Sequence, residues 1–112
     1  MLQRYRLILG DETEQFFASL LKPLPKALRV NTLKISTQNF LLLAQKRNWF
    51  LTPVPWCKDG FFIDRENREI PLGKTPEHYA GLFYLQDASS MLPVEILQPQ
   101  KGEKILDLTS AP

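Results

Sequence analysis

The chain has 112 residues, a formal net charge of +2 and a hydrophobic fraction of 44%. This is enough for one small folded domain and argues against disorder. No apolar run approaches the roughly 18 residues of a membrane helix, and the first ten residues lack the core of a secretory signal. The one cysteine excludes an internal disulfide and a cysteine-rich zinc site, and it favours a cytoplasmic location.

Two helices are predicted at the N-terminus. Apolar residues recur at near-helical spacing over residues 2–9, and Gly10 is a suitable stop. A second helix is predicted over residues 12–21, because Asp11 and Glu14 fit a capping box and an apolar stripe follows them. Two prolines then end the helix and begin an extended linker.

A strand is predicted over residues 27–33, where apolar and polar positions alternate. Leu28 and Val30 would share one face, and Arg29 and Asn31 would share the other. On an exposed face, Arg29 and Asn31 could hold a phosphate and a base edge. In the alternative, Arg29 pairs with a local carboxylate and Asn31 caps a turn.

A helix and a strand pair are predicted to follow. Ser36 or Thr37 caps a helix that runs to about Arg47, where two cations suit its C-terminal dipole. Residues 49–54 and 60–63 are typical of two strands, and the sequence Lys58-Asp59-Gly60 indicates a hairpin turn between them.

The charges are distributed unevenly along the chain. Between Gln15 and Lys58 there is no acidic residue. Nucleic-acid binding needs cations that contact phosphates and aromatic rings that stack on bases. This stretch offers both, because its basic residues lie near Trp49, Phe50 and Trp56. A solvated face with counter-charges from elsewhere explains the pattern equally well. The basic residues of this stretch are Lys22, Lys26, Arg29, Lys34, Lys46, Arg47 and Lys58.

Neither Cys57 nor His78 is a convincing catalytic residue. They are 21 residues apart in different segments, and neither has a partner at a catalytic spacing. We therefore expect Cys57 to be a buried or half-buried thiol and His78 to be a structural or surface residue.

The second half alternates loops and short elements. Residues 64–74 are polar, and they predict a loop around a short edge strand. After this loop, Thr75-Pro76-Glu77 is predicted to start one helical turn. Leu82–Gln86 is typical of a strand. A helix capped by Asp87, Ser89 or Ser90 should then run to about Leu97, with Pro93 in its first turn.

The last segment, Gly102–Pro112, has the pattern of a strand buried on both faces and followed by a ligand loop. Apolar residues dominate Lys104–Leu108, and small residues come after Asp107. Small residues at the end of a first strand let the backbone approach a nucleotide ligand. A plain structural turn explains the same pattern.

Three motifs together resemble the Sun-type RNA cytosine methyltransferases, the RsmF-like group in particular. The first is Arg29-Val30-Asn31-Thr32-Leu33-Lys34, the second is Gln86-Asp87-Ala88-Ser89-Ser90, and the third is Asp107-Leu108-Thr109-Ser110-Ala111-Pro112. In that family the third motif belongs to the S-adenosylmethionine loop, which continues with Gly-Gly/Ser-Lys-Thr. Here Thr109 and Ser110 replace the usual Cys and Ala, and the continuation is absent.

The resemblance implies a small ferredoxin-like or RRM-like α+β domain over residues 1–77. Residues 78–112 would then be the entrance and first strand of a truncated Rossmann-like methyltransferase domain. It further implies that Thr109, Ser110, Ala111 and Pro112 contact S-adenosylmethionine in the full-length enzyme. The same motif places Gln86, Asp87, Ser89 and Ser90 near the cofactor, although helix capping explains them too.

The resemblance also favours RNA binding, to ribosomal or transfer RNA, as the explanation of the charge pattern. The residues expected to bind it are Lys22, Lys26, Arg29, Asn31 and Lys34. The two catalytic cysteines of the family are absent, so we expect no methyl transfer and no bound cofactor from this chain without its C-terminal methyltransferase domain. The alternatives are a stand-alone RNA-binding or protein-interaction module and, less favoured, a fragment of a dinucleotide-dependent oxidoreductase.

Overall fold

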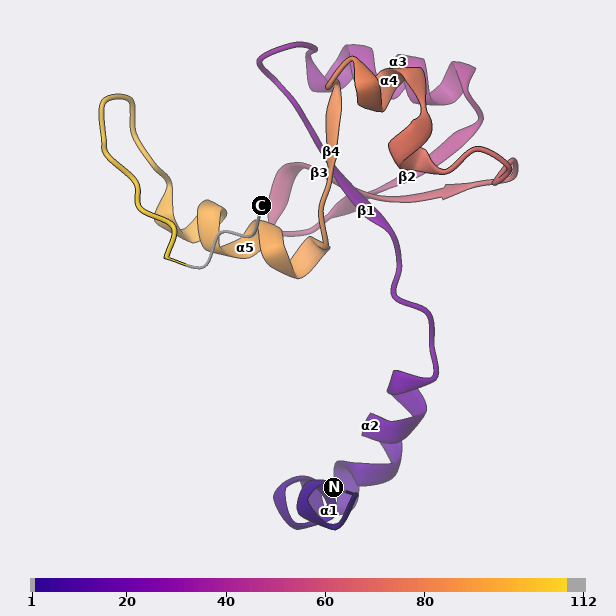
Figure 1. Ribbon diagram of the computed structural model, residues 1–112, viewed down its shortest axis with the longest axis vertical. Coiled ribbons are helices and arrows are strands. Elements are labelled where there is room, and N and C mark those ends of the chain that lie inside the picture. The colour runs from indigo at the N-terminus through magenta and orange to yellow at the C-terminus, as the bar shows by residue number, and fades with distance from the viewer. Residues whose placement is uncertain (1, 109–112) are drawn as a thin grey trace.

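A four-stranded antiparallel sheet is the centre of the computed structural model, which describes residues 2–108 (Figure 1). The strands lie in the order β2-β3-β1-β4, and every neighbouring pair is antiparallel. Their bounds are Ala27–Val30 for β1, Trp49–Val54 for β2, Cys57–Arg65 for β3 and Phe83–Leu85 for β4.

Helices precede, connect and follow the strands. The helix α3 joins β1 to β2, and α4 with the 3-10 turn η2 lies between β3 and β4. This arrangement confirms the predicted α+β class. The bounds are α1 Leu2–Leu9, η1 Gly10–Glu12, α2 Thr13–Leu20, α3 Thr37–Lys46, η2 Leu72–Lys74, α4 Pro76–Tyr79 and α5 Ala88–Leu97.

The larger core lies between the sheet and α3. In Figure 1, α3 and α4 lie together on one side of the sheet and α5 lies on the other. Leu28 and Val30 pack there with Phe40, Trp49 and Phe83. The ring centroid of Phe83 is 5.7 Å from that of Phe40 and 5.8 Å from that of Trp49. Trp49 is therefore a core residue, and the expectation that its ring is available for base stacking is wrong.

The second core lies under α5, on the opposite face. Met91 is fully buried there against Ala27 and Cys57. Gly60 makes room for it, because a Cβ on Gly60 would lie 2.6 Å from Met91 Sδ and 3.0 Å from Cys57 Cβ. Cys57 is a buried thiol, as predicted.

Two predicted helix starts are confirmed by their caps. Ser36 Oγ accepts the backbone N–H of Asn39 at 3.3 Å, at the start of α3. Thr75 Oγ1 accepts the backbone N–H of His78 at 3.4 Å, and Pro76 occupies the first position of α4. Each cap pairs one of the N–H groups that a helix start leaves without an internal partner.

The capping box at Asp11 and Glu14 was predicted wrongly. Gly10–Glu12 forms a 3-10 turn, and Glu12, which precedes α2, makes no capping hydrogen bond with its side chain. The Thr13 hydroxyl instead donates to the Gly10 carbonyl at 2.6 Å. Thr13 therefore makes the side-chain link at this junction.

The β2–β3 hairpin turns earlier than predicted. The strand β3 begins at Cys57, so the loop is Pro55-Trp56 and the expected turn at Lys58-Asp59-Gly60 is wrong. The indole N–H of Trp56 donates to the Ala88 carbonyl at 2.8 Å, at the start of α5. This tertiary contact fixes the loop, and the local Asp-Gly signal is overridden.

The two N-terminal helices pack mainly on each other. Tyr5 of α1 stacks on Phe16 of α2 with ring centroids 5.3 Å apart, and Phe17 lies edge-on to Phe16 at 5.6 Å. Figure 1 shows this pair set apart from the sheet, at the end of the extended linker predicted from the prolines. The helix predicted over residues 12–21 is confirmed as α2.

The expected strand at Lys104–Leu108 is not formed. These residues have no regular structure, and Ile105, Leu106 and Leu108 are 55%, 79% and 86% exposed. A strand of a parallel sheet needs neighbouring strands, and residues 2–108 supply none at this position. The described residues therefore contain no Rossmann-like portion. Pro93 lies inside α5, beyond the first turn where it was expected.

The predicted boundary between residues 77 and 78 falls within α4 and stays a prediction. The strand β4, which follows it, pairs with β1 and completes the sheet. None of the helices between residues 2 and 108 has the length and apolar composition needed to cross a membrane.

Candidate nucleic-acid interface

One part of the sheet face on the α5 side is left uncovered. Because side chains alternate along a strand, Phe50 and Thr52 of β2 point to the same face as Phe62 and Asp64 of β3. The register confirms this, since Phe50 is opposite Asp64 and Thr52 is opposite Phe62. We call these four residues the open sheet face.

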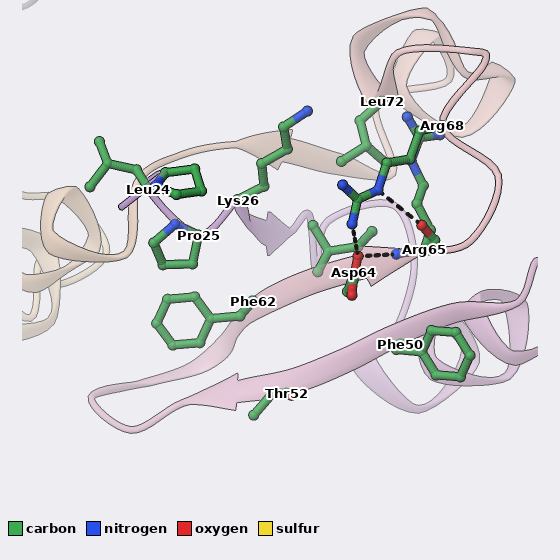
Figure 2. Close-up of a pocket in the computed structure, with 12 residues that line it drawn as sticks. Leu24, Pro25, Lys26, Phe50, Thr52, Phe62, Asp64, Arg65, Arg68 and Leu72 are labelled. Atoms are coloured by element: carbon green, nitrogen blue, oxygen red, sulfur yellow. Dashed lines mark hydrogen bonds and ion pairs between the residues drawn. The ribbon is translucent and has the colours of Figure 1, made fainter. Parts of the chain in front are cut away.

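The open sheet face borders a hollow of about 600 Å³ (Figure 2). Its other walls are the linker at Pro23–Lys26, the end of β3 at Arg65, and the loop that carries Arg68 and Leu72. Figure 2 shows the rings of Phe50 and Phe62 as separate platforms on neighbouring strands. Phe50 is 56% exposed, and Phe62 is half-buried.

The charges that line the hollow are mainly positive. Lys26 and Arg68 line it with a single carboxylate, that of Asp64, which leaves an excess of one positive charge. Arg65 is opposite the core residue Trp49, so its side chain points to the other face of the sheet. Asp64 Oδ1 accepts the backbone N–H of Arg65 at 2.8 Å and Arg68 Nη2–H at 2.7 Å. These two hydrogen bonds, the backbone one first, lower the pKa of the Asp64 carboxyl below its ordinary value. The carboxylate therefore stays charged and orients Arg68.

The residues predicted to bind RNA fall into two groups. Lys22 and Lys26 are exposed, and Lys26 lines the hollow. Arg29, Asn31 and Lys34 lie elsewhere and take part in internal contacts. An RNA contact by any of the five stays a prediction.

The internal contacts of the second group connect separate elements. Arg29 Nη2 lies 3.1 Å from Glu95 Oε1 on α5, so Arg29 pairs with a carboxylate, but with one 66 residues away and not with a local one. Asn31 Nδ2 donates to the Gly81 carbonyl at 2.9 Å, and Lys34 Nζ donates to the Ala80 carbonyl at 2.8 Å. The bonds of Asn31 and Lys34 connect the end of β1 to the turn before β4.

The same Glu95 oxygen also accepts the Cys57 S–H, with a separation of 3.1 Å. Burial raises the pKa of the Cys57 thiol, and the hydrogen bond to Glu95 raises it further. A raised pKa keeps the thiol protonated and weakly nucleophilic. This agrees with a structural role for Cys57.

Three lining residues were not identified from the sequence: Phe62, Arg65 and Arg68. Phe61 and Phe62 are adjacent, and only the strand register shows that Phe61 enters the core while Phe62 faces the hollow. The two arginines lie in or next to a segment that the sequence indicated as a polar loop. Their approach to Lys26 depends on the pairing of β1 with β3.

Gln86, Asp87, Ser89 and Ser90, which the resemblance places near the cofactor, lie at or just before the start of α5. Asp87 precedes the helix, and its carbonyl accepts the backbone N–H of Ser90 at 2.9 Å. Gln86 Nε2 donates to the Ser90 carbonyl at 3.2 Å. Asp87 occupies the N-cap position of α5, but its side chain makes no capping hydrogen bond, so the predicted side-chain cap is not formed there. A role of Gln86, Asp87, Ser89 or Ser90 near a cofactor stays a prediction.

Residues 2–108 contain none of the side chains expected to contact S-adenosylmethionine through the third motif. The expected contacts Thr109, Ser110, Ala111 and Pro112 lie outside the described residues. The segment that leads to them, Lys104–Leu108, forms no strand, so the described chain lacks the sheet edge that supports a nucleotide loop. Among residues 2–108, no group of three or more His, Cys, Asp or Glu side chains is placed to hold a metal ion.

Comparison with known proteins identifies similar chains along nearly the whole length. Residues 1–88 match the family model described as the N-terminal domain of 16S rRNA methyltransferase RsmF. A protein named ribosomal RNA small subunit methyltransferase F from Erwinia tasmaniensis is 50% identical over 106 residues, which is 92% of this chain and 22% of that protein. Its namesake from Vibrio cholerae is 50% identical over 109 residues, 94% of this chain and 23% of that protein.

A solved structure shares the fold. The crystal structure of a methyltransferase homolog protein from Pyrococcus horikoshii superposes with a TM-score of 0.79 at 40% identity. The match covers 90% of this chain and 32% of that chain. The chain thus spans about a fifth of the length of the curated relatives that it matches.

Proposed function

Since the chain belongs to the family of the N-terminal domain of the 16S rRNA methyltransferase RsmF, we propose that it is the RNA-recognising part of an S-adenosylmethionine-dependent rRNA cytosine-5 methyltransferase. The names of the relatives favour ribosomal over transfer RNA as the substrate. The proposed location is the cytoplasm, where ribosomal RNA is found and a free thiol stays reduced.

The observation that carries the proposal is the open sheet face beside a cluster of cations. Lys26 and Arg68 can contact phosphates, and the rings of Phe50 and Phe62 can contact bases. RNA-binding proteins combine these two kinds of side chain, because phosphates attract cations and bases stack on aromatic rings.

The fold supports the same proposal. The element order β1-α3-β2-β3-α4-β4 with sheet order β2-β3-β1-β4 is that of a ferredoxin-like βαββαβ unit. In RNA-binding domains of this kind, the sheet face opposite the two connecting helices carries the stacking aromatics. Phe50 and Phe62 lie on that face here.

Catalysis and cofactor binding are proposed to reside in the C-terminal methyltransferase domain, which would be the chain's covalent partner. The described residues contain one cysteine, and its buried, protonated thiol is unsuited to attack a pyrimidine ring. We therefore propose that the 112-residue chain presents RNA and performs no methyl transfer by itself.

The test is binding of structured ribosomal RNA to the 112-residue chain between about 50 and 200 mM salt. We expect the double variant Lys22→Ala/Lys26→Ala to bind several-fold more weakly. The slope of log affinity against log salt should be shallower by about 0.7 for each phosphate that the variant no longer neutralises. The matched control Lys46→Ala/Lys58→Ala removes the same charge at other exposed positions.

The proposal fails if the wild-type chain does not bind RNA. It fails equally if the control variant loses as much affinity as Lys22→Ala/Lys26→Ala, because binding would then reflect net charge alone.

A further inference from the structure

The open sheet face has the composition of a site for unpaired nucleotides. Phe50 and Phe62 lie diagonally on neighbouring strands, because Phe50 is opposite Asp64 and Phe62 is two residues before Asp64. Diagonal neighbours of this kind are about 7–8 Å apart at their Cα atoms. Two such rings on neighbouring strands can each receive one base of a flexible single strand.

The cations border the rings on one side only. Lys26 precedes β1, and Arg68 lies in the loop after β3. The hydrogen bonds to Asp64 and to the Arg65 carbonyl hold the Arg68 guanidinium beside the hollow (Figure 2). A strand whose bases stack on the rings can therefore direct its phosphates to this border.

The helix α5 limits the site on the opposite side. Met91 is buried over Gly60, and Glu95 is paired with Arg29, so α5 covers the centre of the same sheet face. The remaining exposed aromatic residue of this face, Tyr84, is opposite Arg29 on β4 and is 66% exposed. It belongs to the other edge of the sheet, so α5 separates it from the uncovered surface of the β2–β3 half.

From these three observations we infer that the open sheet face binds a short unpaired RNA segment, with bases stacked on Phe50 and Phe62 and phosphates held by Lys26 and Arg68. A duplex does not fit this chemistry, because its bases are stacked on each other and its outer surface presents phosphates and ribose. The inference rests on the proposed RNA-binding function and adds the class of RNA.

The experiment compares two probes of roughly 12 nucleotides. One is a fluorescently labelled single strand without self-complementarity, and the other is the same strand annealed to its complement. The tested variant is Phe50→Leu/Phe62→Leu, which removes both rings and keeps apolar side chains. The matched control is Tyr84→Leu, which removes an exposed ring from the same face beyond α5. Circular dichroism and thermal melting confirm that each variant is folded.

We expect the wild type to bind the single strand more tightly than the duplex. The double variant should lose about 10-fold or more in single-strand affinity, as expected from one to two stacked bases. It should lose little duplex affinity, and Tyr84→Leu should bind as the wild type does.

Equal or tighter binding of the duplex would overturn the inference. Unchanged single-strand binding by folded Phe50→Leu/Phe62→Leu would also overturn it. Both of these results leave RNA binding itself in place, whereas failure of the proposed function appears as no salt-sensitive binding to either probe.

Discussion

The guanidinium of Arg29 lies 3.1 Å from the carboxylate of Glu95, and this ion pair links the central strand β1 to the last helix, α5. The same carboxylate oxygen accepts the Cys57 S–H. One side chain therefore joins three elements and holds α5 over half of a sheet face. Its position determines how much of that face stays open for a ligand.

Replacing Glu95 with alanine should weaken the attachment of α5. The side chains of Arg29 and Glu95 are only 30% and 28% exposed, so Arg29 would lose its counter-charge in a partly dehydrated position. We expect the free energy of unfolding to fall by about 1–3 kcal/mol. Urea denaturation measures it, with Glu66→Ala as the control for loss of an exposed carboxylate. Equal stability of the two variants would show that the pair does not hold α5.

Replacing Gly60 with alanine should displace Met91. The added Cβ would lie 2.6 Å from Met91 Sδ and 3.0 Å from Cys57 Cβ, and neither side chain has free space because both are fully buried. Overpacking of this kind costs about 1–3 kcal/mol. Thermal unfolding should show a lower Tm than for Gly73→Ala, whose Cβ would lie 3.7 Å from Leu85 Cδ1, an ordinary contact. An unchanged Tm for Gly60→Ala would contradict the close packing of α5.

The stability of the chain should depend on Cys57 at alkaline pH. Burial and the hydrogen bond to Glu95 raise the pKa of the thiol in the folded state, although Arg29 opposes this. Because the folded state holds the thiol proton more tightly, it gains stability relative to the unfolded state. This gain is complete below the unfolded-state pKa of about 8.5, and it is lost as the pH rises through the folded-state pKa. The stability difference between the wild type and Cys57→Ala should therefore shrink above about pH 8.5. A difference that is constant from about pH 7 to pH 10 would contradict the shift.

The order of the elements could be predicted from the sequence because its signals are local. The cap at Ser36, the proline after Thr75 and the alternation around Leu28 each act within a few residues, and α3, α4 and β1 follow from them. The turn at Pro55-Trp56 could not be predicted in this way. It depends on a hydrogen bond to Ala88, 32 residues away.

The candidate site was harder to predict than the fold. Charge patterning indicated Lys26, which lines the hollow, but it gave equal weight to Arg29, whose partner Glu95 is 66 residues away. Phe62 was missed because nothing local distinguishes it from Phe61. The strand at Lys104–Leu108 was predicted from apolar content alone, which does not report whether neighbouring strands are present.

Mapping of backbone amide shifts on addition of the single-stranded probe tests the central claim most directly, namely that RNA binds on the open sheet face. We predict the largest shifts at Lys26, Phe50, Phe62 and Arg68, with small shifts along α5. Large shifts on α5 or on the exposed side of α3, with Phe50 and Phe62 unmoved, would contradict it and place the RNA elsewhere on the domain.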